Sequence, residues 1–199
     1  MEEKIRNDLI AAFDELNVLT LASFYLSEED DIQERIKQII GDVLSMLIKA
    51  YLKGVEHAIL MLGTDFEVDT DKMNQAIYRK IDGRDFTDRI EEYVLRGNFS
   101  AFQVLVETEY HRIYNNAIYD CFVDFSENGD FGVVKVWRTM GDDRVRETHA
   151  YLEGVAVDLE DEFYTLDGDH APYPGGFQKA ENNVNCRCHI EKPNQELSD

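Results

Sequence analysis

The stretch SENGDFGVVKVW, residues 126–137, decides the fold because the texture of the sequence changes there. Upstream of it, apolar residues recur at three- and four-residue spacing, which is typical of amphipathic helices. The stretch itself joins an Asn-Gly turn former to a β-branched run typical of a strand, and the segments that follow are short and loop-rich. We therefore predict an α+β protein, with a helical region over residues 1–125 and a small β-containing C-terminal module over residues 126–199.

Five helices are predicted upstream of this change. The longest carries an apolar stripe from Ile32 to Leu62, with Ser27 as its N-cap and Gly63 as its stop signal. Because this stripe exceeds what one neighbouring helix needs to cover, we expect an exposed apolar strip on this helix, or self-association. The other four helices are expected from Lys4 to Tyr25, from Thr70 to about Gly83, from Thr87 to Leu95 and from Ser100 toward Phe122.

The charge balance restricts the partners. Asp and Glu number 41 against 20 Lys and Arg, which gives a formal net charge of -21. Such a chain is repelled by phosphate backbones and anionic lipid, so direct nucleic-acid binding is not expected and a basic protein surface is the more plausible partner. No stretch approaches the roughly 20 apolar residues that span a bilayer, so no membrane role is expected.

Three cysteines are too few for a secreted disulfide framework, which favours a reducing compartment. In an extended strand Cys186 and Cys188 point to the same side, and a disulfide between them would be strained. Their thiolates could instead share a structural zinc ion with His149, which lies upstream. The fourth ligand is left open among Asp142, Asp143, His170, His189 and water. The alternative is that the two thiols are small packing residues and that His149 is a hydrogen-bonded core residue.

For other residues a functional role is a less specific interpretation than a structural one. Glu107 and His111 have a spacing that can hold metal on a helix, but a solvated helix face is the simpler interpretation. Cys121 is most simply a core residue. Trp137 is most simply the aromatic anchor of the small sheet, with a binding role as the alternative.

The order of four segments carries a resemblance to a known family. The runs VETEYHRIYNNAIYDCF, VVKVWRTMGDDRVRETHAYLEG, YPGG and NCRC, taken together over about residues 100–190, resemble the C-terminal module of the phage head morphogenesis family, the Mu F-like minor head proteins. Besides the three candidate metal ligands, the motif residues are Glu109, Trp137, Asp142, Arg144, Arg146, Gly154, Tyr173, Pro174, Asn185 and Arg187.

The resemblance implies a minor capsid protein of a tailed phage or prophage. It implies synthesis in the host cytoplasm, and assembly into the procapsid through contact with the portal and with capsid or scaffold proteins. The protein would then lie in the virion, at the capsid interior or portal vertex, and its ejection with the DNA is left open. The alternative is an enzyme, a nuclease or ADP-ribosyltransferase-like effector, with His149 as acid-base and Arg146 steadying an anion. We favour assembly and assign no catalytic residue.

Overall fold

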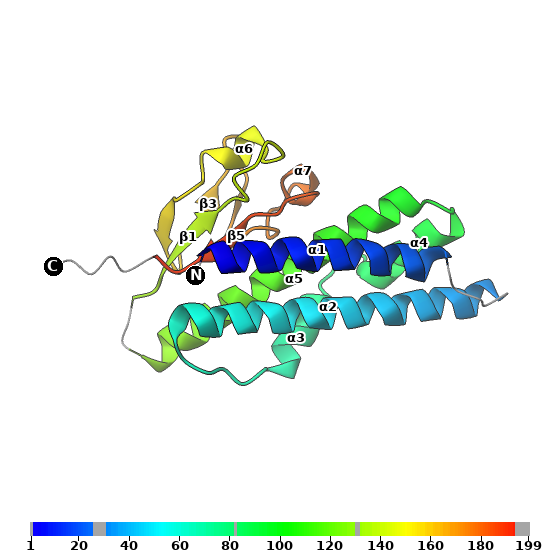
Figure 1. Cartoon of the computed structure of the whole chain (residues 1–199), viewed down its shortest axis with the longest axis horizontal. Helices are drawn as coiled ribbons and strands as arrows, with labels where there is room; N and C mark the ends of the chain where they lie inside the picture. Colours follow the sequence, from blue (N-terminus) through cyan, green and yellow to red (C-terminus); the bar gives the residue numbers. More distant parts are fainter. Residues whose placement is uncertain (1, 26–30, 82, 130–131, 194–199) are drawn as a thin grey trace.

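The helical half of the chain is built around α2 (Ile32–Leu62), which lies antiparallel to α1 (Glu2–Tyr25) along the long axis of the molecule (Figure 1). The structure is a computed structural model, and it describes residues 2–25, 31–81, 83–129 and 132–193. Asp31 caps α2 by accepting hydrogen bonds from the backbone N–H groups of Gln33 and Glu34. Asp31 therefore takes the N-cap role predicted for Ser27, which lies outside the described residues.

The continuous exposed apolar strip expected on α2 is wrong, whereas self-association, expected as its alternative, stays a prediction. Its stripe residues from Ile36 to Val55 are buried, because α2 packs against α5 (Phe99–Asn128) as well as against α1 and the two shorter helices. Two apolar side chains of α2, Ile32 and Leu52, are exposed, but they lie apart on the helix. A longer exposed apolar strip lies on α1, at Ile10, Val18, Leu21 and Tyr25.

The two shorter helices, α3 (Thr70–Ile77) and α4 (Phe86–Leu95), begin at aspartate N-caps. Asp69 and Asp85 accept hydrogen bonds from the first free N–H groups of α3 and α4, respectively, as side chains at N-cap positions do. Helix α3 ends earlier than the predicted Gly83. Helix α5 begins after its N-cap Asn98 and continues six residues beyond the expected end at Phe122.

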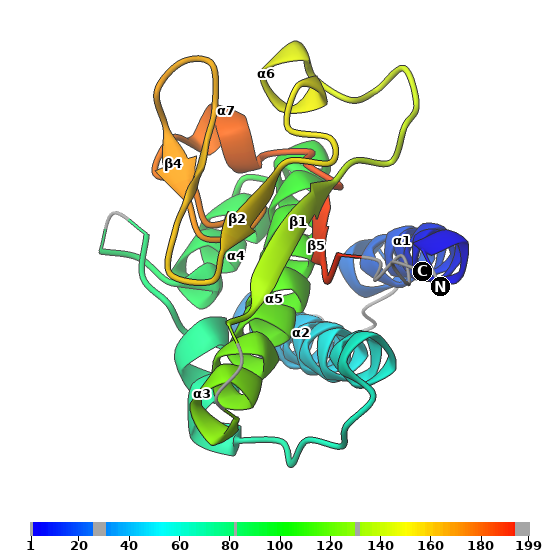
Figure 2. The same cartoon turned by 90° about the vertical axis from the view of Figure 1, so that its left-hand side faces the viewer.

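The β-containing part is a three-stranded antiparallel sheet in the order β2-β1-β5, beside a two-stranded hairpin of β3 and β4 (Figure 2). In the central strand Trp137 lies opposite Ile190 of β5, and both side chains are fully buried. The elements are β1 (Val134–Arg138), α6 (Glu147–Ala150), β2 (Ala156–Asp158), β3 (Phe163–Tyr164), β4 (His170–Ala171), α7 (Ala180–Asn183) and β5 (His189–Glu191). Helices first and small sheets afterwards confirm the α+β prediction.

The predicted boundary at residue 125 falls inside α5, which runs to Asn128. A single hydrophobic core contains residues from α1, α2 and α5 together with Trp137 and Ile190 of the sheet. The division into two regions stays a prediction. Across the described residues, every helix is too short or too polar to cross a lipid bilayer.

Candidate metal centre

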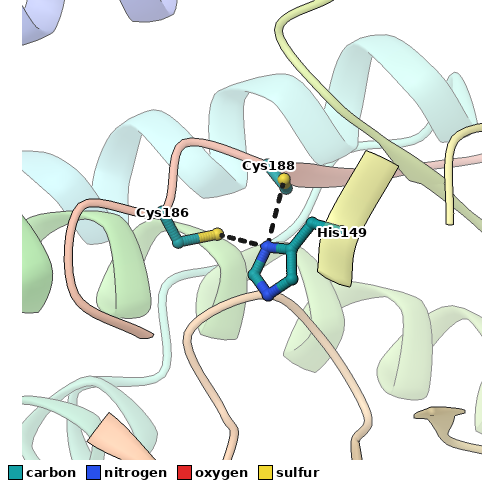
Figure 3. A group of neighbouring side chains, drawn as sticks. All are labelled: His149, Cys186 and Cys188. Atoms are coloured by element: carbon teal, nitrogen blue, oxygen red, sulfur yellow. Dashed lines mark hydrogen bonds between the residues drawn. The ribbon is translucent and has the colours of Figure 1, made fainter. Parts of the chain in front are cut away.

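His149 is placed by the short helix α6, which follows β1 through an irregular loop. Its side chain is 1% exposed and is packed between two aromatic rings, with ring centroids 5.4 Å from Trp137 and 5.5 Å from Phe177. The Nε2 atom of His149 is buried and has no hydrogen-bond partner among the described residues. Ring packing therefore fixes the imidazole and leaves Nδ1 facing the cysteines (Figure 3).

The two cysteines lie in a loop between α7 and β5. Asn185 turns the chain with a positive φ of 57°, a conformation that asparagine tolerates better than most residues. Cys186 and Cys188 are buried and follow this turn as irregular backbone, ahead of the strand that begins at His189. The prediction that both cysteines lie in an extended strand is therefore wrong, because the turn at Asn185 delays the start of β5.

The three side chains nevertheless converge on one point. The Nδ1 atom of His149 lies 3.6 Å from the Sγ atom of Cys186 and 3.7 Å from that of Cys188, and the three candidate ligand atoms lie within 4.8 Å of one another (Figure 3). Zn–N bonds of about 2.0–2.1 Å and Zn–S bonds of about 2.3 Å, set at a tetrahedral angle, place nitrogen and sulfur about 3.6 Å apart. The two nitrogen-to-sulfur distances match those of ligands to a single tetrahedral ion.

Each of the two thiols affects the pKa of the other. Burial opposes ionisation of Cys186, but the hydrogen bond from Cys188 and the nearby His111 and His149 outweigh it, so the pKa of Cys186 is lowered. The hydrogen bond to Cys186, together with burial, raises the pKa of Cys188. A bound zinc ion would require both thiols to be deprotonated.

Two residues of α5 hold the cysteine loop, and the sequence analysis missed both roles. Nε2–H of His111 donates a hydrogen bond to the backbone carbonyl of Cys188. The Asn115 amide donates to the same carbonyl at 3.1 Å and accepts from the N–H of Ile190 at 3.2 Å. His111 is buried, so the solvated helix face expected for it is wrong. The available signal was the i, i+4 spacing of these two polar residues, which places both side chains on one face of the helix.

None of the four residues considered as the fourth ligand joins the group within the described residues. Asp142 accepts a hydrogen bond of 2.7 Å from Arg187, and its pKa is lowered by this bond. His170 is paired with Glu162, and His189 with Glu191. Asp143 is exposed and likewise outside the group. Of the fourth ligands considered from the sequence, water is the one that these contacts leave available.

The other motif residues mostly support the backbone. Glu109 is buried between Arg112 and Arg89, at 2.7 and 2.8 Å, and these arginines keep its pKa low against the effect of burial. Gly154 has a positive φ of 76° and donates to the carbonyl of Trp137. Tyr173 and Pro174 are buried, and the Tyr173 ring lies 5.3 Å from that of Tyr119.

The residues that an enzyme would use, as considered from the sequence, make contacts within the protein. Arg146 donates hydrogen bonds through its two terminal nitrogens to the backbone carbonyls of Glu181 and Val184. These bonds connect the start of α6 to α7 and to the loop that follows α7. His149 is buried, and Arg144 is highly exposed beside Asp142. Trp137 is fully buried, as expected of a sheet anchor. The contacts of these side chains favour a role in holding the module together.

Comparison with known proteins gives one match. The family described as phage Mu protein F like protein matches residues 69–191, which is more than half of the chain. The match begins at the N-cap of α3 and ends at the last residue of β5. No curated protein and no solved structure matches the chain.

Proposed function

Because the chain belongs to the phage Mu protein F-like family, a phage head morphogenesis family, we propose that it is a minor capsid protein of a tailed phage or prophage. In this proposal it joins the procapsid through contact with the portal protein and lies in the virion at the portal vertex or capsid interior. The observation that carries the proposal is the family match, which spans α3 to β5. We further propose that the protein is ejected with the DNA.

We propose that the exposed face of α1 makes the contact with the portal. Helical geometry places Ile10, Val18, Leu21 and Tyr25 within about 80° of arc. Val18 is 68% exposed and Tyr25 59% exposed, so this strip is available to a partner. A second copy of the chain is the less favoured occupant, because each copy carries a formal charge of -21 and like charges repel. An apolar surface with a basic rim on the portal fits both the strip and the charge.

Co-expression with the portal protein of the same phage or prophage tests this contact. Leu21→Asp should weaken the complex by about 2 kcal/mol or more, since it puts a charge into the centre of the strip. Leu166→Asp, at a more exposed apolar position on the β3–β4 turn, should leave the complex intact. Binding is measured by native mass spectrometry over a salt series. Equal binding by both variants, or self-association through α1 without portal binding, would contradict the proposal.

We also propose that His149, Cys186 and Cys188 hold a structural zinc ion. When bound, zinc would cross-link α6 to the closing segment of the chain. The proposal is supported by the ligand spacing and by the burial of all three side chains. A staple of this kind suits a small sheet, because zinc binding free energies of about 10–16 kcal/mol rival the stability of a whole domain.

Elemental analysis of the purified protein, with native mass spectrometry, tests the zinc site. About one zinc ion per chain is expected, with loss of both metal and thermal stability in Cys186→Ser and His149→Ala. Cys121→Ser is the matched control, because Cys121 is also a buried free thiol but lies on α5, outside the group. Zinc retained by both variants, or absent from the wild type, would refute the site.

A further inference from the structure

A small cavity borders all three candidate ligands. It has a volume of about 10 Å³, and its lining includes His149, Cys186 and Cys188. This space is about that of a single water molecule. The cavity therefore adjoins every side chain of the cluster, and a tetrahedral ion held by three protein ligands keeps a fourth position for a small ligand.

This cavity adjoins an open groove. The groove has a volume of about 400 Å³ and is lined by α1, through Ile10 and Phe13, and by the cysteine loop. Cys186, Arg144 and Arg187 line both spaces, so the cavity and the groove meet at these side chains. A small molecule in the groove is thus one layer of side chains from the cluster.

The charges around the cavity favour an anion. Its lining includes Arg144, Arg146 and Arg187, and no carboxylate of the described residues is part of it. Arg146 donates to backbone carbonyls, so those bonds leave its positive charge uncompensated. Asp142 contacts the other two arginines but does not line the cavity. Two carboxylates, those of Asp14 and Glu107, line the groove outside the cavity.

We propose that a metal ion in this cluster keeps an exchangeable fourth ligand, a water molecule that a small monodentate anion entering from the groove replaces. This inference rests on the proposed metal centre. Zinc sites with three protein ligands and an open position bind exogenous ligands, whereas sites with four protein ligands are closed. The cluster would then be a binding site for small anions as well as a staple, with Arg144 on the path of the incoming ligand.

Cobalt(II) loading of the full-length protein tests the open position, because cobalt adopts the same geometry and its visible absorption reports a change of ligand. Titration with sodium azide should shift the visible bands in a saturable way. Arg144→Ala should raise the azide Kd about threefold to fivefold, as expected for the loss of one exposed charge. Arg96→Ala, an exposed arginine on the turn after α4, is the matched control and should leave the Kd unchanged.

The outcomes separate this inference from the proposals on which it depends. Cobalt bound with thiolate charge-transfer absorption but without any response to azide would overturn the open position alone, since the fourth ligand would then come from the protein. Failure to bind cobalt would overturn both the open position and the metal centre, and would leave the head-assembly proposal intact. An equal azide Kd in wild type and Arg144→Ala would refute the role of the arginine.

Discussion

Helix α2 crosses α5 at Gly54, where the structure leaves no room for a methyl group. A Cβ atom at this position would lie 2.4 Å from the backbone carbonyl oxygen of Tyr114 and 2.8 Å from the Cβ of Ala117. Non-bonded carbon atoms usually stay about 3.5–4.0 Å apart. The obstacle is the backbone of a helix and cannot rotate away, so Gly54→Ala must push α2 and α5 apart.

Gly41 on the same helix supplies the comparison. A Cβ atom there meets no atom within 4 Å, so Gly41→Ala should stabilise the protein by about 0.8–1.0 kcal/mol through helix propensity alone. Gly54→Ala gains the same propensity but pays the cost of overpacking, typically about 1–3 kcal/mol. Because the contact is with backbone, the upper end applies and a net loss of about 2 kcal/mol remains. The two variants should therefore differ by about 3 kcal/mol.

Urea unfolding followed by circular dichroism measures this difference. The midpoint should rise in Gly41→Ala and fall in Gly54→Ala, with similar slopes in both. Both substitutions remove one glycine from the same helix, so their difference isolates the crossing with α5. A Gly54→Ala midpoint equal to or above that of wild type would refute the close approach of the two helices.

Three further substitutions test buried polar contacts. Glu109→Gln should lower the free energy of unfolding by about 3–5 kcal/mol, because it leaves the buried Arg112 without its carboxylate. The pKa of Glu109 is lowered in the fold, so wild type should lose this stability as the pH falls below about 4.5, the ordinary glutamate pKa. Denaturant unfolding at several pH values checks both points. Asn115→Ala should cost about 1–3 kcal/mol in thermal or denaturant unfolding, since the N–H of Ile190 loses its buried partner. Burial raises the pKa of Asp120 to about 6, so the carboxylate form is disfavoured in the fold. The free energy of unfolding of wild type should therefore fall by about 1 kcal/mol as the pH rises from about 4 to 7, and that of Asp120→Asn should not show this fall.

Local patterns were enough to predict the helices and the central strand. The apolar spacing placed α2 to its last residue, Leu62, because the glycine after it adopts the left-handed conformation that ends helices. The β-branched run before Trp137 became β1 for a comparable local reason. These features depend on residues close together in sequence, so they are readable without knowledge of the fold.

The parts that the sequence did not reveal depend on distant contacts. His111 and Asn115 contact each other within α5, and the docked cysteine loop supplies a further buried partner to both, the carbonyl of Cys188. The positive φ at Asn185 turns the chain just before the cysteines, and the last strand begins only at His189. The grouping of His149 with the cysteines was accessible because ligand chemistry restricts which residue types can share a metal, even when the backbone between them is unknown.

Helix α5 connects these observations, because it serves two packing surfaces at once. Tyr114 and Ala117 lie against α2 at Gly54, whereas Asn115 holds the closing segment that carries the cysteines. The composition change at residue 126 therefore marks a change of secondary structure inside a shared core. The family match begins at the N-cap of α3 and so includes α5 with the sheet, but leaves out α1 and α2. The α1 strip proposed to bind the portal thus lies outside the matched unit, where a partner-specific surface can vary without disturbing the cluster that α5 positions.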